Sequence, residues 1–310
     1  MGTFPSEVLL ASLKNQIHTL STSNNFDNIN TMTVAPAVKS AIQWISATAL
    51  LLLVACAPAP NIYSYQARSQ ESRVQSVILH FTREDFPTAL KTLTEGEVSS
   101  HYLVRDEPVE IYQLVDESQR AYHAGISSWK GRTFLNASSI GIEIVNAGDR
   151  PGPEGISYHD YPTPQIDAVI ALLKDIVARH RIRPEYILGH SDVAPHRKTD
   201  PGPKFPWKRL ADEGLIPWPE RAAVAMRQEE YQAALPDLLW FQNKLIEHGF
   251  ALSPTGTLDK ETQEILAAFQ MKYRPERYDG RPDAETAALL DVLTSPQTKE
   301  DKNPSLKTNT

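Results

Sequence analysis

Apolar and polar positions in the middle of the chain follow the periods of strands and helices in turn. Residues 73–82 (RVQSVILHFT) concentrate β-branched and aromatic side chains in a short run, which is typical of a buried strand. The stretch DFPTALKTL then predicts a short helix, and SSHYLV and VEIYQLV predict two strands separated by the charged turn RDEP. His80 falls near the carboxyl end of the first strand, and strand ends are where sites are built.

Residues 139–146 (SIGIEIVN) alternate strictly between the two faces of a strand. Ile140, Ile142 and Ile144 share one face, and Glu143 points from the other. The pattern predicts an acidic side chain in the middle of a strand, opposite the core.

A helix and a further strand follow. Residues 163–180 open with Thr and Pro and place apolar side chains at helical spacing, which predicts an amphipathic helix that covers a sheet. Residues 185–190 (EYILGH) then predict a strand that delivers His190 at its end. Strands interleaved with helices indicate an α/β domain.

The carboxyl-terminal part repeats one pattern, Gly-x-x-Asp-x-Glu-Thr, at 256–262 and at 280–286. Each copy places an Asp at an N-cap position and a Glu in the first turn, so each predicts the start of a helix. Together with the preceding stretch PDLLWFQNKLIEHGF, they predict a small all-α domain of three helices over residues 236–293, after a charged, Ala-rich linker at 219–235. Residues 294–310 are polar and are expected to be disordered.

An apolar segment, residues 40–55, follows Lys39 and precedes Cys56. It is too short and too lightly flanked to predict a spanning helix. The order of a positive residue, an apolar core and the sequence LVAC resembles a bacterial lipoprotein signal, which implies that Cys56 is lipidated and becomes the new N-terminus. A buried helix or a plain membrane anchor is the alternative. Residues 1–56 are therefore expected to be the signal, with Met32 as an alternative start.

The residues after the cysteine extend this interpretation. Ala57, in place of Asp, implies sorting to the outer membrane, with the protein facing the periplasm. Residues 57–72 are rich in Pro, Ser and Gln and are expected to form a tether.

Composition narrows the partners and the chemistry. The 310 residues are 41% hydrophobic, which allows two domains with cores of their own. A net charge of −7 without a long Lys/Arg run argues against nucleic acid as a partner. Because Cys56 is the single cysteine, any metal must be held by His, Asp or Glu.

The loop GHSDVAPHRKTDPG, residues 189–202, concentrates groups that can bind a metal or a proton. If its HRKTD run is extended, His196, Lys198 and Asp200 project on the same side. With the strand-end histidine described above, a second imidazole and a carboxylate would make a three-ligand zinc set whose fourth position stays open, as in catalytic sites. Spacing alone does not decide between His190 and His196 as the second imidazole.

Six ordered blocks between residues 73 and 218 resemble the zinc-dependent N-acetylmuramoyl-L-alanine amidases of the type-2 amidase superfamily, which are related to peptidoglycan recognition proteins. The blocks are VILHFT, HYLV, AYHAGISSWKGR, LNASSIGIEIVN, GHSDVAPHRKTDPGPKFPW and LIPW. The resemblance implies that residues 73–218 form a catalytic domain with a mixed central β-sheet flanked by helices.

The same resemblance implies roles for individual residues. The implied zinc ligands are His80, His190 and Asp200, and the implied catalytic pair is Glu143 and Lys198. His196 then occupies a variable position of the motif and is expected at the surface or at the substrate rim. Among the other histidines, His123 is expected to line the groove and touch substrate, and His101 to pack beneath the site or lie near it.

The implied reaction is hydrolysis of the amide bond between N-acetylmuramic acid, or its 1,6-anhydro form, and the L-alanine of the peptidoglycan stem peptide. Zinc would polarise the carbonyl and lower the pKa of bound water toward about 7. Glu143 would pass the water proton to the departing amine, and Lys198 would stabilise the oxyanion. The alternatives are a non-catalytic peptidoglycan recognition protein on the same scaffold and a zinc hydrolase for another amide.

Residues 236–293 resemble the small helical peptidoglycan-binding domain. The resemblance implies that this domain attaches the enzyme to peptidoglycan, so its deletion is expected to spare small soluble muropeptides. The alternative is a helical module that only packs on the amidase domain, since a fold does not fix a function.

Overall fold

The computed structural model describes residues 62–152 and 155–295. The predicted signal with its lipidation site Cys56, the first residues of the tether and residues 296–310 of the predicted tail lie outside the described residues. All described helices and strands belong to one compact unit, which begins at Ser69. Within the described ranges, no helix combines the length and apolar character that crossing a membrane requires.

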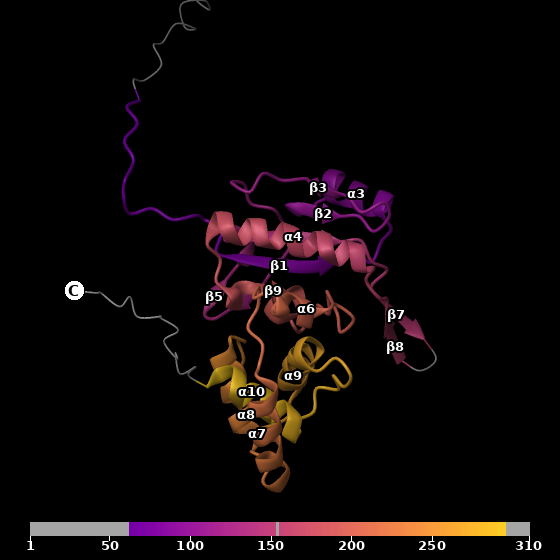
Figure 1. Ribbon diagram of the computed structural model, residues 1–310, viewed down its shortest axis with the longest axis vertical. Coiled ribbons are helices and arrows are strands. Elements are labelled where there is room, and N and C mark those ends of the chain that lie inside the picture. The colour runs from indigo at the N-terminus through magenta and orange to yellow at the C-terminus, as the bar shows by residue number, and fades with distance from the viewer. Residues whose placement is uncertain (1–61, 153–154, 296–310) are drawn as a thin grey trace, which may run out of the picture. The chain divides into compact units, whose positions relative to one another are not determined.

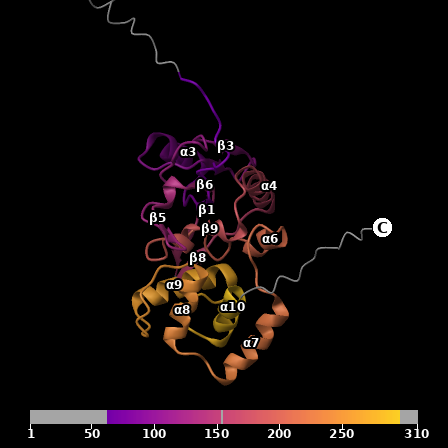
Figure 2. The same cartoon turned by 90° about the vertical axis from the view of Figure 1, so that its left-hand side faces the viewer.

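A five-stranded mixed sheet organises the first part of this unit, with strand order β3-β2-β6-β1-β9 (Figures 1 and 2). Four strands run parallel to their neighbours: β2 (Tyr102–Val104), β6 (Ser139–Ile144), β1 (Ser76–Phe81) and β9 (Ile187–Gly189). β3 (Ile111–Gln113) is antiparallel to β2 at the edge. All six residues of β1 are buried, as its dense β-branched and aromatic composition predicts. The predicted mixed central sheet is confirmed.

Helices flank the sheet as expected. α3 (Phe86–Glu95) begins where the side chain of Asp85 accepts a hydrogen bond from the amide of Thr88, which satisfies one of the free N–H groups of its first turn. α4 (Thr163–His180) buries its apolar stripe in the same hydrophobic cluster as the sheet. The predicted amphipathic helix over residues 163–180 is therefore confirmed.

Short elements complete this part of the chain. Two hairpins pair β4 (Ser128–Trp129) with β5 (Arg132–Thr133) and β7 (Asp149–Gly152) with β8 (Gly155–Tyr158). The short helices are η2 (Leu135–Ala137), η3 (Pro184–Tyr186), α5 (His190–Val193) and α6 (Trp207–Asp212).

The carboxyl-terminal part is helical. Its helices are α7 (Arg221–Ala233), α8 (Leu238–His248), α9 (Lys260–Tyr273) and α10 (Ala284–Thr294), which gather together in Figure 2. The side chains of Asp259 and Asp283 accept hydrogen bonds from amides in the first turns of α9 and α10, so the repeated pattern does start two helices. The predicted linker at 219–235 contains α7, which joins this group because Tyr231 donates to Asp291 on α10 at 3.0 Å.

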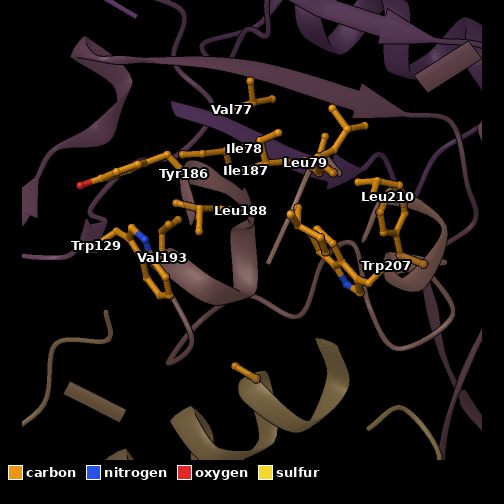
Figure 3. Close-up of a cluster of buried hydrophobic side chains, with 14 of the residues drawn as sticks. Val77, Ile78, Leu79, Trp129, Tyr186, Ile187, Leu188, Val193, Trp207 and Leu210 are labelled. Atoms are coloured by element: carbon orange, nitrogen blue, oxygen red, sulfur yellow. The ribbon is translucent and has the colours of Figure 1, made fainter. Parts of the chain in front are cut away.

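One hydrophobic cluster runs through both parts. Figure 3 shows a portion of it, where side chains of β1, β9, α5 and α6 pack together with Trp129. The ring of Trp129 also meets the rings of His248 and Phe250 at centroid distances of 5.6 and 5.2 Å. Beside it, the amide of Lys130 donates to the carbonyl of Gly249 at 2.8 Å. The helical part therefore contributes to the core that lies beneath the sheet.

Candidate active site

Three neighbouring parallel strands place polar side chains at one level of the sheet. In the register between β1 and β6, His80 pairs with Glu143. Between β1 and β9, Leu79 pairs with Gly189, so the next residue, His190, follows at the level of His80. His190 is the first residue of α5 and not the last residue of the predicted strand. The carboxyl ends of these strands thus form the floor of a site, as is usual for open α/β sheets.

A buried triangle of ligand atoms lies at these strand ends. The Nδ1 atoms of His80 and His190 are 2.9 Å apart, and Oδ2 of Asp200 lies 3.0 Å from the first and 3.1 Å from the second. Zinc bonds of about 2.0–2.1 Å in a tetrahedral set separate neighbouring ligand atoms by roughly 3.3 Å, which is close to this spacing. Within the described part of the chain, this is the only group of His, Cys, Asp and Glu side chains able to share a metal ion.

Hydrogen bonds on the far side of each imidazole leave Nδ1 facing the triangle. Nε2 of His190 donates to the carbonyl of Ala124 at 3.2 Å, and Nε2 of His80 lies 3.0 Å from Nδ1 of His123. A partner on the second ring nitrogen commonly fixes the tautomer and orientation of a metal-binding histidine. Burial, and then the nearby His190, lowers the pKa of His80 to about 4, so its imidazole is neutral at pH 7.

Asp200 supplies the negative charge of the triangle. Burial alone would raise the pKa of its carboxyl, but the charges and hydrogen bonds of His190 and His80 outweigh burial and hold the pKa well below its usual range. The backbone connects two corners of the triangle, because the amide of Ser191 donates to the carbonyl of Asp200 at 2.9 Å. A neutral imidazole and an ionised carboxylate are the protonation states in which these groups bind a metal.

Glu143 lies in a cavity of about 240 Å³ next to the triangle. The predicted metal ligands, Lys198 and His123 line the same cavity. Glu143 leaves β6 on the side away from the isoleucine face, as the alternation predicts, and its Oε2 atom is buried without a hydrogen-bond partner among the described residues. Burial and then the charge of Asp200 raise the pKa of this carboxyl well above its usual value, against the opposing effect of Lys198. Such a carboxyl is suited to exchanging protons.

The loop after α5 turns back and is not extended. The amide of Lys198 donates to the carbonyl of Ala194 at 3.1 Å. As a result, His196 faces α9, with its Nδ1 atom 3.1 Å from Oε2 of Glu264, while Lys198 and Asp200 line the cavity. The expectation that these three loop side chains project on one side is wrong, because it assumed an extended backbone. His196 lies outside the group that could hold a metal.

Two further histidines lie behind His80. The ring of His123 meets that of His80 edge-on with centroids 5.1 Å apart, and His101 packs against His123 at 5.8 Å. Gly141 on β6 leaves the necessary room, since a Cβ atom there would lie 2.5 Å from the ring of His123. His101 is fully buried, and its Nδ1 accepts a hydrogen bond from the amide of Gly141 at 3.0 Å. His101 therefore packs beneath the site, and contact of His123 with substrate stays a prediction.

Two residues of the loop at 189–202 take part in this arrangement without having been singled out by the sequence. Asp192 is buried, and its Oδ2 atom accepts a hydrogen bond from the amide of Gly189 at 2.8 Å, immediately before His190. Arg197 donates to the carbonyl of Ala124, which is also the hydrogen-bond partner of His190. Their charge gave no signal in a loop already rich in charge, and the fold alone identifies their distant partners, the carbonyl of Ala124 for Arg197 and the side chain of Lys272 for Asp192.

Comparison with known families agrees with this geometry. Residues 70–203 match a family described as N-acetylmuramoyl-L-alanine amidase, and residues 235–290 match one described as putative peptidoglycan binding domain. The first match contains every side chain of the triangle and cavity discussed above. The second covers α8, α9 and the first part of α10.

Similar proteins and structures come from bacteria. The chain is 40% identical over 267 residues to the N-acetylmuramoyl-L-alanine amidase AmiD of Escherichia coli K12, an alignment that covers 81% of this chain and 96% of AmiD. It is also 38% identical over 113 residues to the 1,6-anhydro-N-acetylmuramyl-L-alanine amidase AmpD of Enterobacter cloacae, covering 36% of this chain and 55% of AmpD.

Two solved structures resemble the whole described arrangement. A complex of Escherichia coli AmiD with anhydro-N-acetylmuramic acid-L-Ala-D-γ-Glu-L-Lys has a TM-score of 0.68 and 39% identity, covering 74% of this chain and 91% of AmiD. A complex of Pseudomonas aeruginosa AmpDh3 with anhydromuramic pentapeptide has a TM-score of 0.70 and 38% identity, covering 76% of this chain and 97% of AmpDh3.

Proposed function

Because the chain belongs to the family of N-acetylmuramoyl-L-alanine amidases, we propose that its buried His-His-Asp triangle holds the zinc ion of an amide hydrolase. The reaction is that of the family, hydrolysis of the amide bond between N-acetylmuramic acid and the L-alanine of the peptidoglycan stem peptide, in cell-wall turnover. The observation that carries the zinc proposal is the triangle itself, in which His80, His190 and Asp200 point their ligand atoms at one place.

The residues around the triangle would have different roles in the reaction. Bound zinc would supply Lewis-acid chemistry at the amide carbonyl and at water. Glu143 would accept the proton of the attacking water and return it to the departing amine, a role supported by its unpartnered oxygen in the cavity. Lys198, which lines the same cavity, would stabilise the negative charge that develops on the carbonyl oxygen. His123 would hold His80 in place and line the groove for substrate.

The substrate proposal extends to muropeptides with a 1,6-anhydro sugar. The structures of AmiD and AmpDh3 were solved with such ligands, and both proteins are similar to this chain over most of their length. The experiment is digestion of purified sacculi and of an anhydromuropeptide, followed by mass analysis of the products. Free stem peptide beginning with L-alanine is the expected product. Binding without release of stem peptide would instead indicate the non-catalytic recognition protein, and cleavage of another amide bond would indicate a different hydrolase.

We assign attachment to peptidoglycan to the helical part of the chain, residues 236–293. Support comes from the family that matches residues 235–290, described as putative peptidoglycan binding domain. Sedimentation with sacculi tests this role, using full-length protein with Glu143 replaced by Gln so that the sacculi stay intact. Failure to sediment would leave the helical part as a module that only packs on the amidase part.

We further propose that lipid on Cys56 anchors the protein to the outer membrane, facing the periplasm. The support is the sequence alone, a positive residue followed by an apolar core and LVAC. Cys56→Ser should release the protein from membranes, and labelling with a radioactive fatty acid should be lost with it. Membrane association that survives the substitution, with residues 40–55 still attached, would indicate a plain transmembrane anchor.

A further inference from the structure

A buried lysine of the helical part finds its hydrogen-bond partners outside that part. Lys272, in the last turn of α9, is 5% exposed. Its Nζ atom lies 2.6 Å from Oδ2 of Asp192 and 3.4 Å from the carbonyl oxygen of Ile187, and it stands 4.3 Å from the ring centre of Trp207. A buried ammonium group is tolerated only when it is well paired, so the position of this side chain is specific.

Both hydrogen-bond acceptors of Lys272 lie within three residues of His190, a predicted zinc ligand. Ile187 belongs to β9, which ends just before His190, and Asp192 is in the first turn of α5, which begins with His190. The Oδ2 atom of Asp192 also accepts the amide of Gly189 at 2.8 Å. Lys272 therefore joins the end of the strand to the start of the helix across the junction where His190 leaves the backbone.

α5 depends on such external contacts for its position. It has four residues, and a helix of one turn has almost no stability of its own. The same short segment reaches a second ligand, since the amide of Ser191 donates to the carbonyl of Asp200 at 2.9 Å. A displacement of α5 would consequently move two corners of the triangle.

We propose that Lys272 is a positioning residue for the metal centre, so that the helical part of the chain helps to build the catalytic site as well as attaching it to peptidoglycan. Lys272 acts through Asp192 and the backbone of residues 187–190, and it does not touch substrate. This inference rests on the proposed zinc site. It differs from simple packing because a packing contact alone would affect stability and leave the affinity for zinc unchanged.

The test is Lys272→Met in the full-length protein. We expect its affinity for zinc, measured by competition with a chelator at a temperature where the variant stays folded, to fall about 10- to 100-fold, as on loss of partners that orient metal ligands. With cobalt in place of zinc, the visible absorption bands should change shape, because they report the ligand geometry. On a soluble muropeptide, kcat should fall while KM stays near the parental value.

Arg274→Met is the matched control. Arg274 follows directly after α9, is also 5% exposed and also forms an ion pair, with Asp283 at 2.5 Å, but its partners lie within the helical part. It should lower stability and leave zinc affinity and the cobalt spectrum parental. Equal losses of zinc affinity in both variants would show a general effect of destabilisation and would overturn the proposal.

A second variant covers the case in which Lys272→Met does not fold because it leaves the Asp192 charge buried. The double substitution Lys272→Met with Asp192→Asn removes both charges and keeps an acceptor for the amide of Gly189. Lowered zinc affinity in this variant supports the proposal, and parental affinity in a folded variant overturns it. Parental protein that binds no zinc, or binds it equally well after His190→Ala, would overturn the zinc site as well.

Discussion

The substitution Glu143→Gln tests whether the protein is an amidase or a scaffold that only binds zinc. The substitution keeps the shape of the side chain and one hydrogen-bonding oxygen, and it removes the proton acceptor. Its Oε2 atom has no hydrogen-bond partner among the described residues, so replacing that oxygen breaks no hydrogen bond. We therefore expect a change in unfolding free energy within about 0.5 kcal/mol and unchanged zinc content.

The rate should respond far more than the stability. Loss of a general base typically costs about 10²- to 10⁴-fold, which corresponds to roughly 3–5 kcal/mol in the activation free energy. The assay is release of stem peptide from a soluble muropeptide, with bound zinc measured on the same samples. Glu84→Gln is the control, because Glu84 lines the same cavity but its Oε2 atom already accepts a hydrogen bond from Thr92 at 3.1 Å, and this variant should stay within a few-fold of the parent. If Glu143→Gln cleaves at the parental rate with full zinc, another group must be the base.

Three further outcomes follow from the structure. Asp200→Ala should lose zinc first and activity as a result, so metal analysis and rate should fall together, whereas full zinc in an inactive variant would contradict the ligand assignment. Deleting residues 221–310 should unfold the remaining protein or abolish its activity on soluble muropeptides as well as on sacculi, because α8 and α9 share its hydrophobic core. Circular dichroism and the same assay check this. A folded remainder that still cleaves soluble muropeptides would instead support the expectation drawn from the sequence. Burial, with the charges of Lys272 and Lys130, lowers the pKa of His248 to about 3 in the folded protein. Between about pH 6.5 and pH 3 the unfolded chain therefore binds a proton that the folded protein does not, and the stability of the fold decreases as the pH falls through this range. His248→Phe should lessen that fall when denaturant unfolding is compared at pH 7 and pH 5, and an equal fall in both proteins would show that His248 does not titrate as described.

Local signals predicted the elements that local interactions decide. Asp259 and Asp283 cap α9 and α10 because an N-cap needs only a side chain and an amide three residues later. The apolar pattern placed the two histidines at strand ends and Glu143 in the middle of a strand on the face opposite the core, because it marks each strand and its alternation. Their pairing across strands required the register, which the sequence does not state.

Contacts between distant segments stayed beyond prediction. The pair formed by Lys272 and Asp192 joins residues 80 positions apart, and nothing around either residue indicates the other. The charged, Ala-rich composition of residues 219–235 predicted a linker. The helix α7 in this segment packs on α10 but buries none of its residues fully, so its sequence shows only a weak apolar pattern. The turn after Ala194 was missed because the alternation rule holds only where the backbone is extended.

The contact between Trp129 and the end of α8 limits how this protein can be recombined with its relatives. Gly249 has a φ of 145°, and a Cβ atom there would lie 2.8 Å from the indole of Trp129, so the residue is constrained both by its own backbone and by a side chain 120 positions away. A chimera that exchanges the helical part for that of another protein would uncover this indole unless the new partner offers the same small residue at the same bend. Such hybrids should therefore fold only when the β4–β5 hairpin and the end of α8 are transferred together. These two segments lie in different family matches, the hairpin in residues 70–203 and the end of α8 in residues 235–290.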